Sequence, residues 1–215
     1  MKRSKNKPKY LSSKQYTLLT GATGLLGRYL MRDLLLKGHR LAVLVRPSEN
    51  AKARERVEAI LQMWESELEQ RLPRPVLLVG DVCQTNLGLS ERHISWVEDF
   101  CSEIIHAAAI LNFHGDSRSS EPWRTNLSGT ENVITFAQRR DIKKLHYVST
   151  AYVCGKRSET VMESDLDAEQ TFRNDYENSK FEAEQLIHAA EGFEAKTIFR
   201  PAVIVGDSKT GYTST

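Results

Sequence analysis

The sequence predicts an α/β protein built around a doubly wound parallel sheet. Apolar runs of strand length alternate with segments of helical periodicity along most of the chain. One of these runs, Leu41–Val45, is nearly all apolar, as is typical of strands buried on both faces of a sheet. Three glycines, spaced three apart, separate the first run from the first helical segment. Alternating strands and helices give parallel strands with right-handed crossovers, so ligands are expected beyond the carboxyl ends of the strands.

The first strand is expected at Tyr16–Thr20, immediately before the glycines. Across residues 26–34, leucines recur every four positions, which places them on one face of a helix. Gly38 follows this helix, and glycine commonly stands just past a helix end. Leu41–Val45 is apolar throughout and is expected to form a second, buried strand.

Residues 49–71 carry many charges and regularly spaced apolar residues, which is typical of a surface helix that Pro73 stops. Val76–Val79 is expected to be the third strand. A short helix around 94–100 and a fourth strand at Glu103–Ala107 follow it.

The remaining segments continue the alternation. A helix is expected at Asn126–Arg140, a fifth strand at Leu145–Ser149, a helix at 175–190 and a sixth strand at Lys196–Phe199. A chain of 215 residues is long enough for one large domain, which we expect at 15–215.

The composition is that of a soluble globular protein, with 40% hydrophobic and 27% charged residues. The first 14 residues carry six Lys or Arg and no acid, which leaves 24 basic and 28 acidic side chains, a net charge of −4, in the remainder. An acidic body argues against nucleic-acid binding, so no nucleic-acid partner is expected. Residues 1–14 are expected to form a disordered basic tail. Contact of this tail with RNA, an acidic partner or a membrane surface is the alternative interpretation.

The cysteines, Cys83, Cys101 and Cys154, are widely spaced and form no C-x-x-C pair, so we expect reduced thiols in a cytoplasmic protein. The histidines show no H-x-x-x-H pair, and no metal site is expected. No apolar run approaches the length of a membrane helix, and the basic N-terminus lacks the apolar core of a secretory signal. Neither a membrane span nor a signal peptide is therefore expected.

The stretch T-G-A-T-G-L-L-G, residues 20–27, joins the first strand to the first helix. Gly21 permits a tight turn, Gly24 lets a pyrophosphate approach the backbone, and Gly27 lets the helix pack closely on the sheet. The helix N-terminus then offers unpaired N–H groups and a partial positive charge to that pyrophosphate. We therefore expect a dinucleotide site rather than a merely structural turn. Its expected contacts in this stretch are Gly21, Thr23, Gly24, Leu25, Leu26 and Gly27.

The end of the second strand indicates which dinucleotide binds. NAD sites carry an acid there for the ribose hydroxyls, whereas this chain reads V-L-V-R-P and has no acid before Glu49. Arg46 can pair with a 2′-phosphate through a charge-assisted fork. NADP(H) is therefore expected rather than NAD. After the third strand, Asp81 either accepts a hydrogen bond from the adenine amino group or caps a turn, and Val82 is expected to line the same region.

Tyrosine is followed four residues later by lysine three times, starting at Tyr10, Tyr152 and Tyr176. Tyr10 lies in the tail, and Gly155 interrupts the second pair. The third pair, Tyr176 and Lys180, opens a helix and shares one face of it, so this pair is favoured as catalytic.

Such a pair suits proton transfer to a reacting oxygen. A free phenol has a pKa of about 10, and a nearby ammonium such as Lys180 is expected to lower the pKa of Tyr176. Thr150, just past the fifth strand, is expected to complete an oxyanion clamp. Ser149 is the alternative, although strand alternation points it toward the sheet.

Further motifs accompany these residues: G-D-V at 80–82, H-A-A-A at 106–109, N-L-x-G-T at 126–130, V-S-T-A-Y-V-C-G at 148–155 and R-P-A-V-I-V-G at 200–206. Together they resemble the extended short-chain dehydrogenase/reductase family, which has a Rossmann fold, over residues 16–211. Within it, the chain is most similar to thioester reductases and fatty acyl-CoA reductases, the male-sterility-like branch. The motifs behind that assignment are L-V-R-P at 44–47, A-A-I-L-N-F at 108–113 and G-D-S-K-T-G at 206–211.

The resemblance implies a catalytic set of Thr150, Tyr176 and Lys180, the last two also touching the cofactor. It implies that Asn126 lies at the cofactor site and braces the ends of the fourth and fifth strands. Further implied cofactor contacts are Ala107, Ala108 and Ala109, and, along the nicotinamide, Pro201, Ala202 and Val203. Family members build the substrate site from residues after the sixth strand, so this part is expected to be largely missing from the chain.

The function implied by the resemblance is NADP(H)-dependent reduction of an acyl thioester to an aldehyde or alcohol. The thioester would be carried by coenzyme A or by an acyl carrier protein. Two alternatives stay open: a sugar-nucleotide epimerase or dehydratase, or a hydroxysteroid-type dehydrogenase, of the same family; and a dinucleotide-binding module without catalysis. Assembly as a homodimer is also left open.

Overall fold

The structure, a computed structural model, describes residues 15–48 and 51–213. The predicted tail at 1–14, with the Tyr10 and Lys14 pair, lies outside the described residues, as do 49–50 and 214–215.

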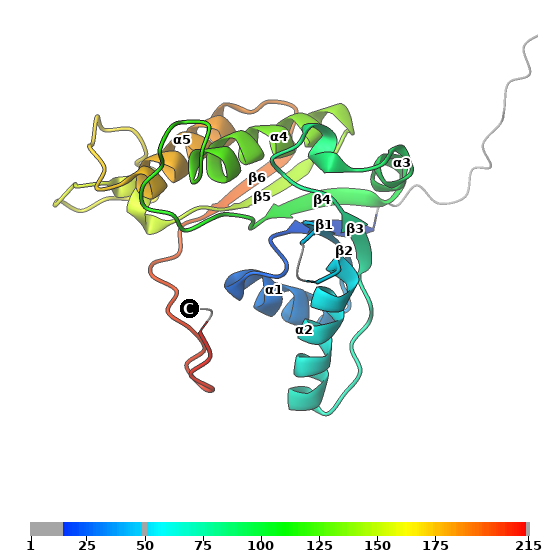
Figure 1. The fold of residues 1–215 in the computed structure, drawn as a ribbon. Coiled ribbons are helices and arrows are strands. Elements are labelled where there is room, and N and C mark those ends of the chain that lie inside the picture. Colours follow the sequence, from blue (N-terminus) through cyan, green and yellow to red (C-terminus); the bar gives the residue numbers. More distant parts are fainter. Residues whose placement is uncertain (1–14, 49–50, 214–215) are drawn as a thin grey trace, which may run out of the picture.

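A six-stranded parallel sheet forms the centre of the described chain, in the order β3-β2-β1-β4-β5-β6. The chain winds outward from β1 to β3, then returns to the centre at β4 and winds outward on the other side. This reversal confirms the predicted doubly wound α/β fold (Figure 1). The strands are β1 (Tyr16–Thr20), β2 (Arg40–Val45), β3 (Val76–Val79), β4 (Cys101–His106), β5 (Lys144–Val148) and β6 (Ala195–Phe199).

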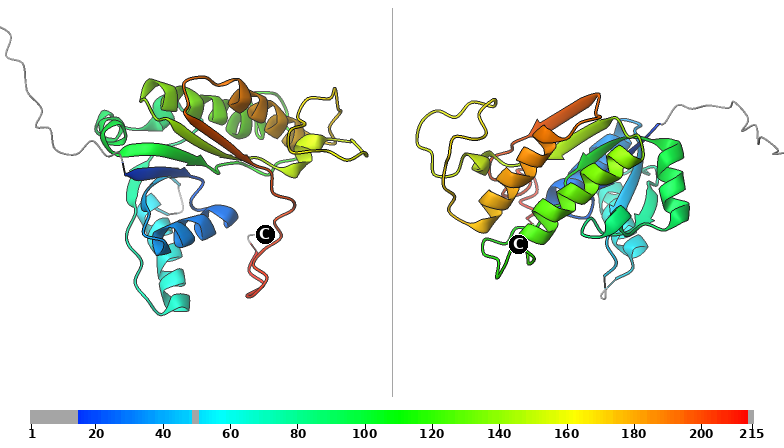
Figure 2. Two further views of the ribbon diagram at one scale, coloured as in Figure 1. Left: turned by 180° about the vertical axis from the view of Figure 1, so that it is seen from behind. Right: turned by 90° about the horizontal axis from the view of Figure 1, so that it is seen from above.

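Helices cover both faces of the sheet, with α1 and α2 on one face and α3, α4 and α5 on the other (Figures 1 and 2). Within the part of the chain that the structure describes, no helix has the length and apolar character of a membrane span. The helices are α1 (Leu25–Leu36), α2 (Ala53–Leu68), α3 (Glu91–Phe100), α4 (Gly129–Arg139) and α5 (Asp175–Ala189). Short helical turns lie at Thr85–Gly88, Arg124–Ser128 and Ala151–Cys154.

Alternate residues of the central strands enter two separate cores. Leu18, Leu44 and Ile104 pack on the side of α3, α4 and α5, whereas Leu19 and Val43 pack on the side of α1 and α2. Successive side chains of a strand point to opposite faces, so a strand covered on both faces is apolar at every position. This explains the continuous apolar runs at Leu41–Val45 of β2 and Val76–Val79 of β3.

The predicted strands and helices are present, with small shifts at their ends. β1 and β3 have the predicted bounds, and β4 begins two residues earlier than expected, at Cys101. The helix predicted at Asn126–Arg140 starts instead with a π turn at Arg124–Ser128 and continues as α4. In this wider turn the Asn126 carbonyl accepts a hydrogen bond from the Thr130 hydroxyl (2.6 Å).

Candidate active site

Two cavities open at the carboxyl ends of the strands. The first, of about 300 Å³, lies over the ends of β1, β2 and β3. The second, of about 650 Å³, lies over the ends of β5 and β6 and beside the start of α5. Ala107 and Ala109, directly after β4, line both cavities, so the two meet at the centre of the sheet. This is where a doubly wound sheet binds its ligand.

Most of the predicted site residues line one of these cavities. Those in the first are Gly21, Thr23, Gly24, Arg46, Val82, Ala107, Ala108 and Ala109. Those in the second are Leu26, Ala107, Ala109, Thr150, Tyr176, Lys180, Pro201, Ala202 and Val203. Those in neither are Leu25, Gly27, Asp81 and Asn126. Among residues 15–48 and 51–213, no cluster of His, Cys, Asp or Glu side chains is arranged to hold a metal ion.

The glycine loop forms a backbone cradle at the start of α1. Gly21 has a left-handed φ of +74°, and a Cβ on it would lie 2.6 Å from the Ala107 backbone. A Cβ on Gly27 would lie 1.9 Å from the Gly21 carbonyl oxygen, so even one methyl group would displace the loop. A Cβ on Gly24 would meet only that same oxygen, at 3.4 Å, and Gly24 borders the first cavity. No side chain caps α1, which leaves its first N–H groups available to an anion.

Two arginines stand at the edge of the first cavity beyond β2. Arg46, the predicted phosphate ligand, is exposed. Arg56, near the start of α2, lines the same cavity, and its guanidinium donates to the Thr23 hydroxyl (2.8 Å) and to the Arg46 carbonyl (3.1 Å). Arg56 was not predicted from the sequence, because residues 49–71 were interpreted as a surface helix. The available signal was a basic residue one turn into the helix that follows the second strand.

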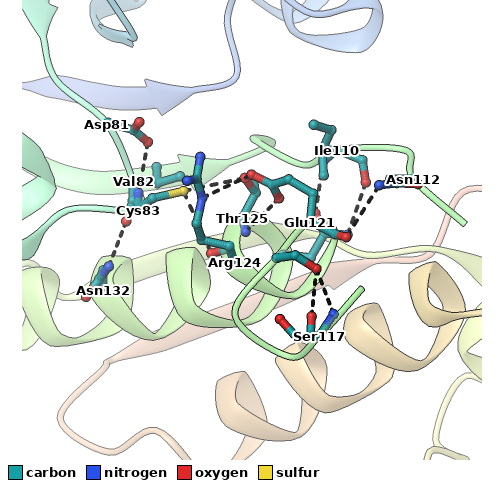
Figure 3. Close-up of polar contacts among 12 residues, drawn as sticks. Asp81, Val82, Cys83, Ile110, Asn112, Ser117, Glu121, Arg124, Thr125 and Asn132 are labelled. Carbon is teal, nitrogen blue, oxygen red and sulfur yellow. Dashed lines mark hydrogen bonds and ion pairs between the residues drawn. The ribbon is translucent and has the colours of Figure 1, made fainter. Parts of the chain in front are cut away.

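Hydrogen bonds hold the turn after β3 against the first cavity (Figure 3). Asp81 accepts from the Cys83 N–H (2.9 Å), and the Asn132 amide donates to the Val82 carbonyl (2.9 Å). The Cys83 thiol lies 3.4 Å from the hydroxyl of Thr125, and burial raises the pKa of this thiol. Asp81 therefore caps a turn, which was one of its two expected roles. Thr125 lines the cavity and was not named from the sequence.

Thr150, Tyr176 and Lys180 meet at the second cavity, from the end of β5 and the first turns of α5. Asn174 caps α5 by accepting from the Glu177 N–H (2.9 Å), so the helix begins directly before the tyrosine. Tyr176 and Lys180 follow four residues apart and face the same cavity. Burial raises the pKa of Tyr176, and a hydrogen bond with Thr150 acts in the opposite direction.

Lys180 is 1% exposed. Its Nζ donates to the Val148 carbonyl (2.8 Å) and lies 4.2 Å from the centroid of the Tyr147 ring. Burial lowers the pKa of Lys180 to about 7, while Glu184 acts in the opposite direction. The expectation that this ammonium lowers the pKa of Tyr176 is not met. Burial of the phenol dominates, and the ammonium is held against β5 instead.

The competing pair, Tyr152 and Lys156, does not share a helical face, because Gly155 between them has a φ of +62°. Tyr152 nevertheless lines the second cavity. Phe113, which was not named from the sequence, lines it too and lies edge-on to Tyr176 with ring centroids 6.4 Å apart. The tyrosine thus faces a cavity with apolar and aromatic walls.

Ser149 and Thr150 differ in where their hydroxyls point. The Ser149 hydroxyl donates to the buried carboxylate of Glu184. The Thr150 hydroxyl accepts from the Tyr152 N–H (3.3 Å) and interacts with Tyr176. The structure therefore brings Thr150, rather than Ser149, to the phenol.

Asn126 braces the segment after β4, where Ile110 lines the second cavity. Its side chain accepts from the Ile110 N–H (2.9 Å) and donates to the Ile110 carbonyl (3.1 Å) and to the Ser179 hydroxyl on α5 (3.1 Å). Asn126 is 1% exposed. The brace thus joins the chain after β4 to α5, whereas it was expected from the sequence between the ends of β4 and β5.

The histidine of H-A-A-A, His106, also has a structural position. Its Nδ1 lies 2.7 Å from the Thr20 hydroxyl and its Nε2 lies 3.1 Å from the Thr130 hydroxyl. Burial lowers the pKa of His106 to about 3, so the ring is neutral at physiological pH. It bridges the end of β1 to α4 beneath the first cavity.

Comparison with known proteins gives the family. Residues 19–215 match the family model of NAD-binding proteins described as male sterility protein. The chain is 33% identical over 204 residues to one of the subunits of linear gramicidin synthase from Brevibacillus parabrevis, a match that covers 92% of this chain and 4% of that protein. It is 34% identical over 222 residues to the nonribosomal peptide synthetase asaC of Aspergillus flavus, covering 97% of this chain and 21% of that protein.

A solved structure shows the same arrangement. The terminal R domain from the myxalamid PKS-NRPS biosynthetic pathway has a TM-score of 0.76 and 32% identity, and the match covers 91% of this chain and 50% of that one. The chain therefore spans about half the length of that domain and a small part of each relative above. With its glycine loop and its family match, the chain belongs to the male sterility family, in the thioester reductase branch of the extended short-chain dehydrogenases/reductases.

Proposed function

We propose that the chain carries the cofactor site and the catalytic set of an NADP(H)-dependent reductase that converts an acyl thioester into an aldehyde, or onward into an alcohol. The observation that supports this most is the meeting of the two cavities at Ala107 and Ala109. A dinucleotide lying over the glycine loop in the first cavity can extend toward Thr150, Tyr176 and Lys180 in the second. The relatives named as peptide synthetases, and the R domain, favour a thioester on a carrier protein over one on coenzyme A.

The residues of the first cavity fit a phosphorylated dinucleotide. Gly24 leaves room beside the uncapped N-terminus of α1, where a pyrophosphate meets free N–H groups. Beyond β2, where NAD sites carry an acid, Arg46 and Arg56 place two basic side chains. A 2′-phosphate would give both guanidinium groups a charge-assisted partner. We therefore assign NADP(H) rather than NAD.

The residues of the second cavity suit reduction of a carbonyl. When bound, NADPH supplies the hydride. Thr150 and Tyr176 donate hydrogen bonds to the carbonyl oxygen as negative charge develops on it, and Tyr176 gives that oxygen its proton. The Tyr176 phenolate then takes back the hydroxyl proton of the resulting hemithioacetal as the C–S bond breaks. The aldehyde and a thiolate result, and the thiolate takes a proton from solvent to become the free thiol. Lys180 supplies positive charge on the same side of α5 while the phenolate exists.

The substitution Tyr176→Phe tests this assignment. It removes the proton donor and keeps the ring, so NADPH affinity should stay near that of the wild type. Turnover of a carrier-bound or coenzyme A thioester should fall roughly 100-fold or more, since general acid catalysis contributes at least about that much. The measurements are NADPH fluorescence titration and NADPH consumption, with Tyr152→Phe as the matched variant of the competing pair, which should retain most turnover.

The same assay separates the alternatives. Full turnover by Tyr176→Phe would reject the catalytic role of this tyrosine. Turnover of sugar nucleotides or steroids instead of thioesters would move the protein to another branch of the family. NADPH binding with no turnover of any carbonyl substrate would favour a binding module.

A further inference from the structure

A buried carboxylate lies behind the second cavity. Glu184, one helical turn after Lys180 on α5, has no exposed surface. Its Oε1 accepts from Arg200 Nε (2.9 Å) and Nη2 (2.6 Å), and its Oε2 accepts from the Ser149 hydroxyl. The two oxygens of one carboxylate therefore hold two different strand ends.

Both partners stand directly before residues of the proposed site. Ser149 precedes Thr150, and Arg200 precedes Pro201, which lines the second cavity. The Arg200 side chain is 15% exposed and also donates from Nη1 to the Asp165 carbonyl (2.9 Å). The end of β5, the end of β6 and α5 thus converge on Glu184.

Charged and titratable groups surround Glu184, and Cys154, Glu163 and His188 line with it a third cavity of about 410 Å³. Arg200 faces it from the end of β6, and Tyr147 faces it from β5, where Glu184 adds to the burial that raises the pKa of this phenol. On α5, the mostly exposed His188 places Nε2 3.6 Å from Glu184 Oε1, and Lys180 lies one turn before. Glu184 also opposes the burial that lowers the pKa of Lys180.

Stability alone does not account for this group. Replacing a buried ion pair with packed apolar side chains is often neutral or stabilising, so a buried pair is weak evidence of a stabilising role. Its contacts with the residues directly before Thr150 and Pro201, one helical turn after Lys180, indicate a role at the active site.

We propose that Glu184 is a positioning residue of the active site. Through Ser149 and Arg200 it fixes the two strand ends that present Thr150 and Pro201, and its negative charge, one helical turn from Lys180, favours the protonated form of that amine. The catalytic consequence rests on the proposed function, whereas the effect on Lys180 is measurable without any turnover.

The charge effect is tested by NMR titration of the full chain labelled with [¹³Cε]lysine. The Lys180 signal is assigned by its loss in Lys180→Arg. In Glu184→Gln, the midpoint of the Lys180 titration should move down by about one pH unit, because an opposite charge one helical turn from the ammonium has been removed. Glu182→Gln, which neutralises a carboxylate on the same helix that pairs with Arg118 at the surface, should leave the midpoint unchanged.

Glu184→Gln leaves Arg200 without its carboxylate partner, which can prevent folding. A second variant is therefore used if Glu184→Gln does not fold. The double variant Glu184→Gln/Arg200→Gln keeps two polar side chains without a lone buried charge. It should move the midpoint down by a smaller amount, because loss of the Arg200 cation acts in the opposite direction. An unchanged Lys180 midpoint in the folded variants overturns the charge effect.

The pH profile of turnover separates the geometric effect from the charge effect. Glu184→Gln should move the alkaline limb of kcat to lower pH, in step with Lys180. Ser149→Ala keeps the charge but frees the end of β5, so it should lower kcat roughly tenfold through misplacement of Thr150 without moving the limb. Wild-type kcat in Ser149→Ala overturns the geometric effect. If Glu184→Gln shifts the Lys180 midpoint but the wild type reduces no thioester, the proposed function is refuted and the charge effect is still supported.

Discussion

At the scale of single residues, Lys180 combines a catalytic role in the proposed reaction with a cost in stability. Burial lowers its pKa from 10.5 to about 7, because the charged form loses its hydration. A base whose pKa is lower in the folded than in the unfolded chain destabilises the fold at low pH. The penalty is complete below the folded pKa and fades as pH rises toward the unfolded pKa.

Lys180→Met is therefore expected to raise the free energy of unfolding by roughly 2 kcal/mol below about pH 7, while turnover is lost. Each unit of pKa corresponds to about 1.4 kcal/mol, and loss of the hydrogen bond to Val148 offsets part of the gain. The gain should shrink as pH rises from about 7 to about 10. Urea unfolding at about pH 6 and about pH 9 measures it. Lys37→Met, at an exposed position after α1, is the control. A variant no more stable than the wild type at the lower pH would contradict the penalty.

At the scale of elements, the glycines of the loop before α1 look equivalent in sequence but differ in their surroundings in the structure. Gly27 is required by the fold, since its Cα faces the Gly21 carbonyl at a distance that excludes a Cβ. We propose that Gly24 serves the ligand instead, since a Cβ there meets one atom at ordinary contact distance and Gly24 borders the first cavity. The two positions should therefore separate folding from binding.

Gly27→Ala is expected to destabilise the protein by roughly 2 kcal/mol, the range of overpacked sites. Gly24→Ala should change stability by less than about 1 kcal/mol, the difference between glycine and alanine at a helix N-cap. Its NADPH affinity should nevertheless fall at least about tenfold, because the Cβ enters the space of the pyrophosphate. Circular dichroism melts and NADPH titrations give both quantities. Wild-type affinity in Gly24→Ala would mean that the pyrophosphate does not lie over this loop.

At the scale of the whole molecule, the two cavities draw their walls from both halves of the sheet. The first uses β1, β2 and α2, and the second uses β5, α5 and the end of β6. A ligand that spans them contacts segments from Gly21 to Val203, so its binding should stabilise the entire fold rather than one loop.

NADPH at about 100 times its Kd should add about 2.7 kcal/mol of stability, which corresponds to a Tm increase of roughly 5–10 °C for a domain of this size. NADH at the same concentration should give a smaller increase. Arg46→Ala and Arg56→Ala should each reduce the difference between the two cofactors, and Arg54→Ala, an exposed arginine on α2, should not. Equal shifts with NADPH and NADH in the wild type would reject the assignment of NADP(H).

The sequence by itself determined the order of strands and helices and the position of the glycine loop. Tyr16–Thr20 and Val76–Val79 have the predicted bounds because apolar runs and helical periodicity are local properties of the chain. The choice of Tyr176 over Tyr152 was also local, since it needed only four-residue spacing on an uninterrupted helix.

Only the tertiary structure decided which distant side chains meet and how burial changes their charge. Arg56 reaches the first cavity, and Glu184 joins two strand ends, through contacts between segments that no periodicity links. The pKa of Tyr176 is raised rather than lowered, because burial of the phenol outweighs its hydrogen bond with Thr150, while the Lys180 ammonium is held by the Val148 carbonyl. Desolvation and distance are properties of the packed molecule, whereas pattern and backbone freedom are properties of the chain.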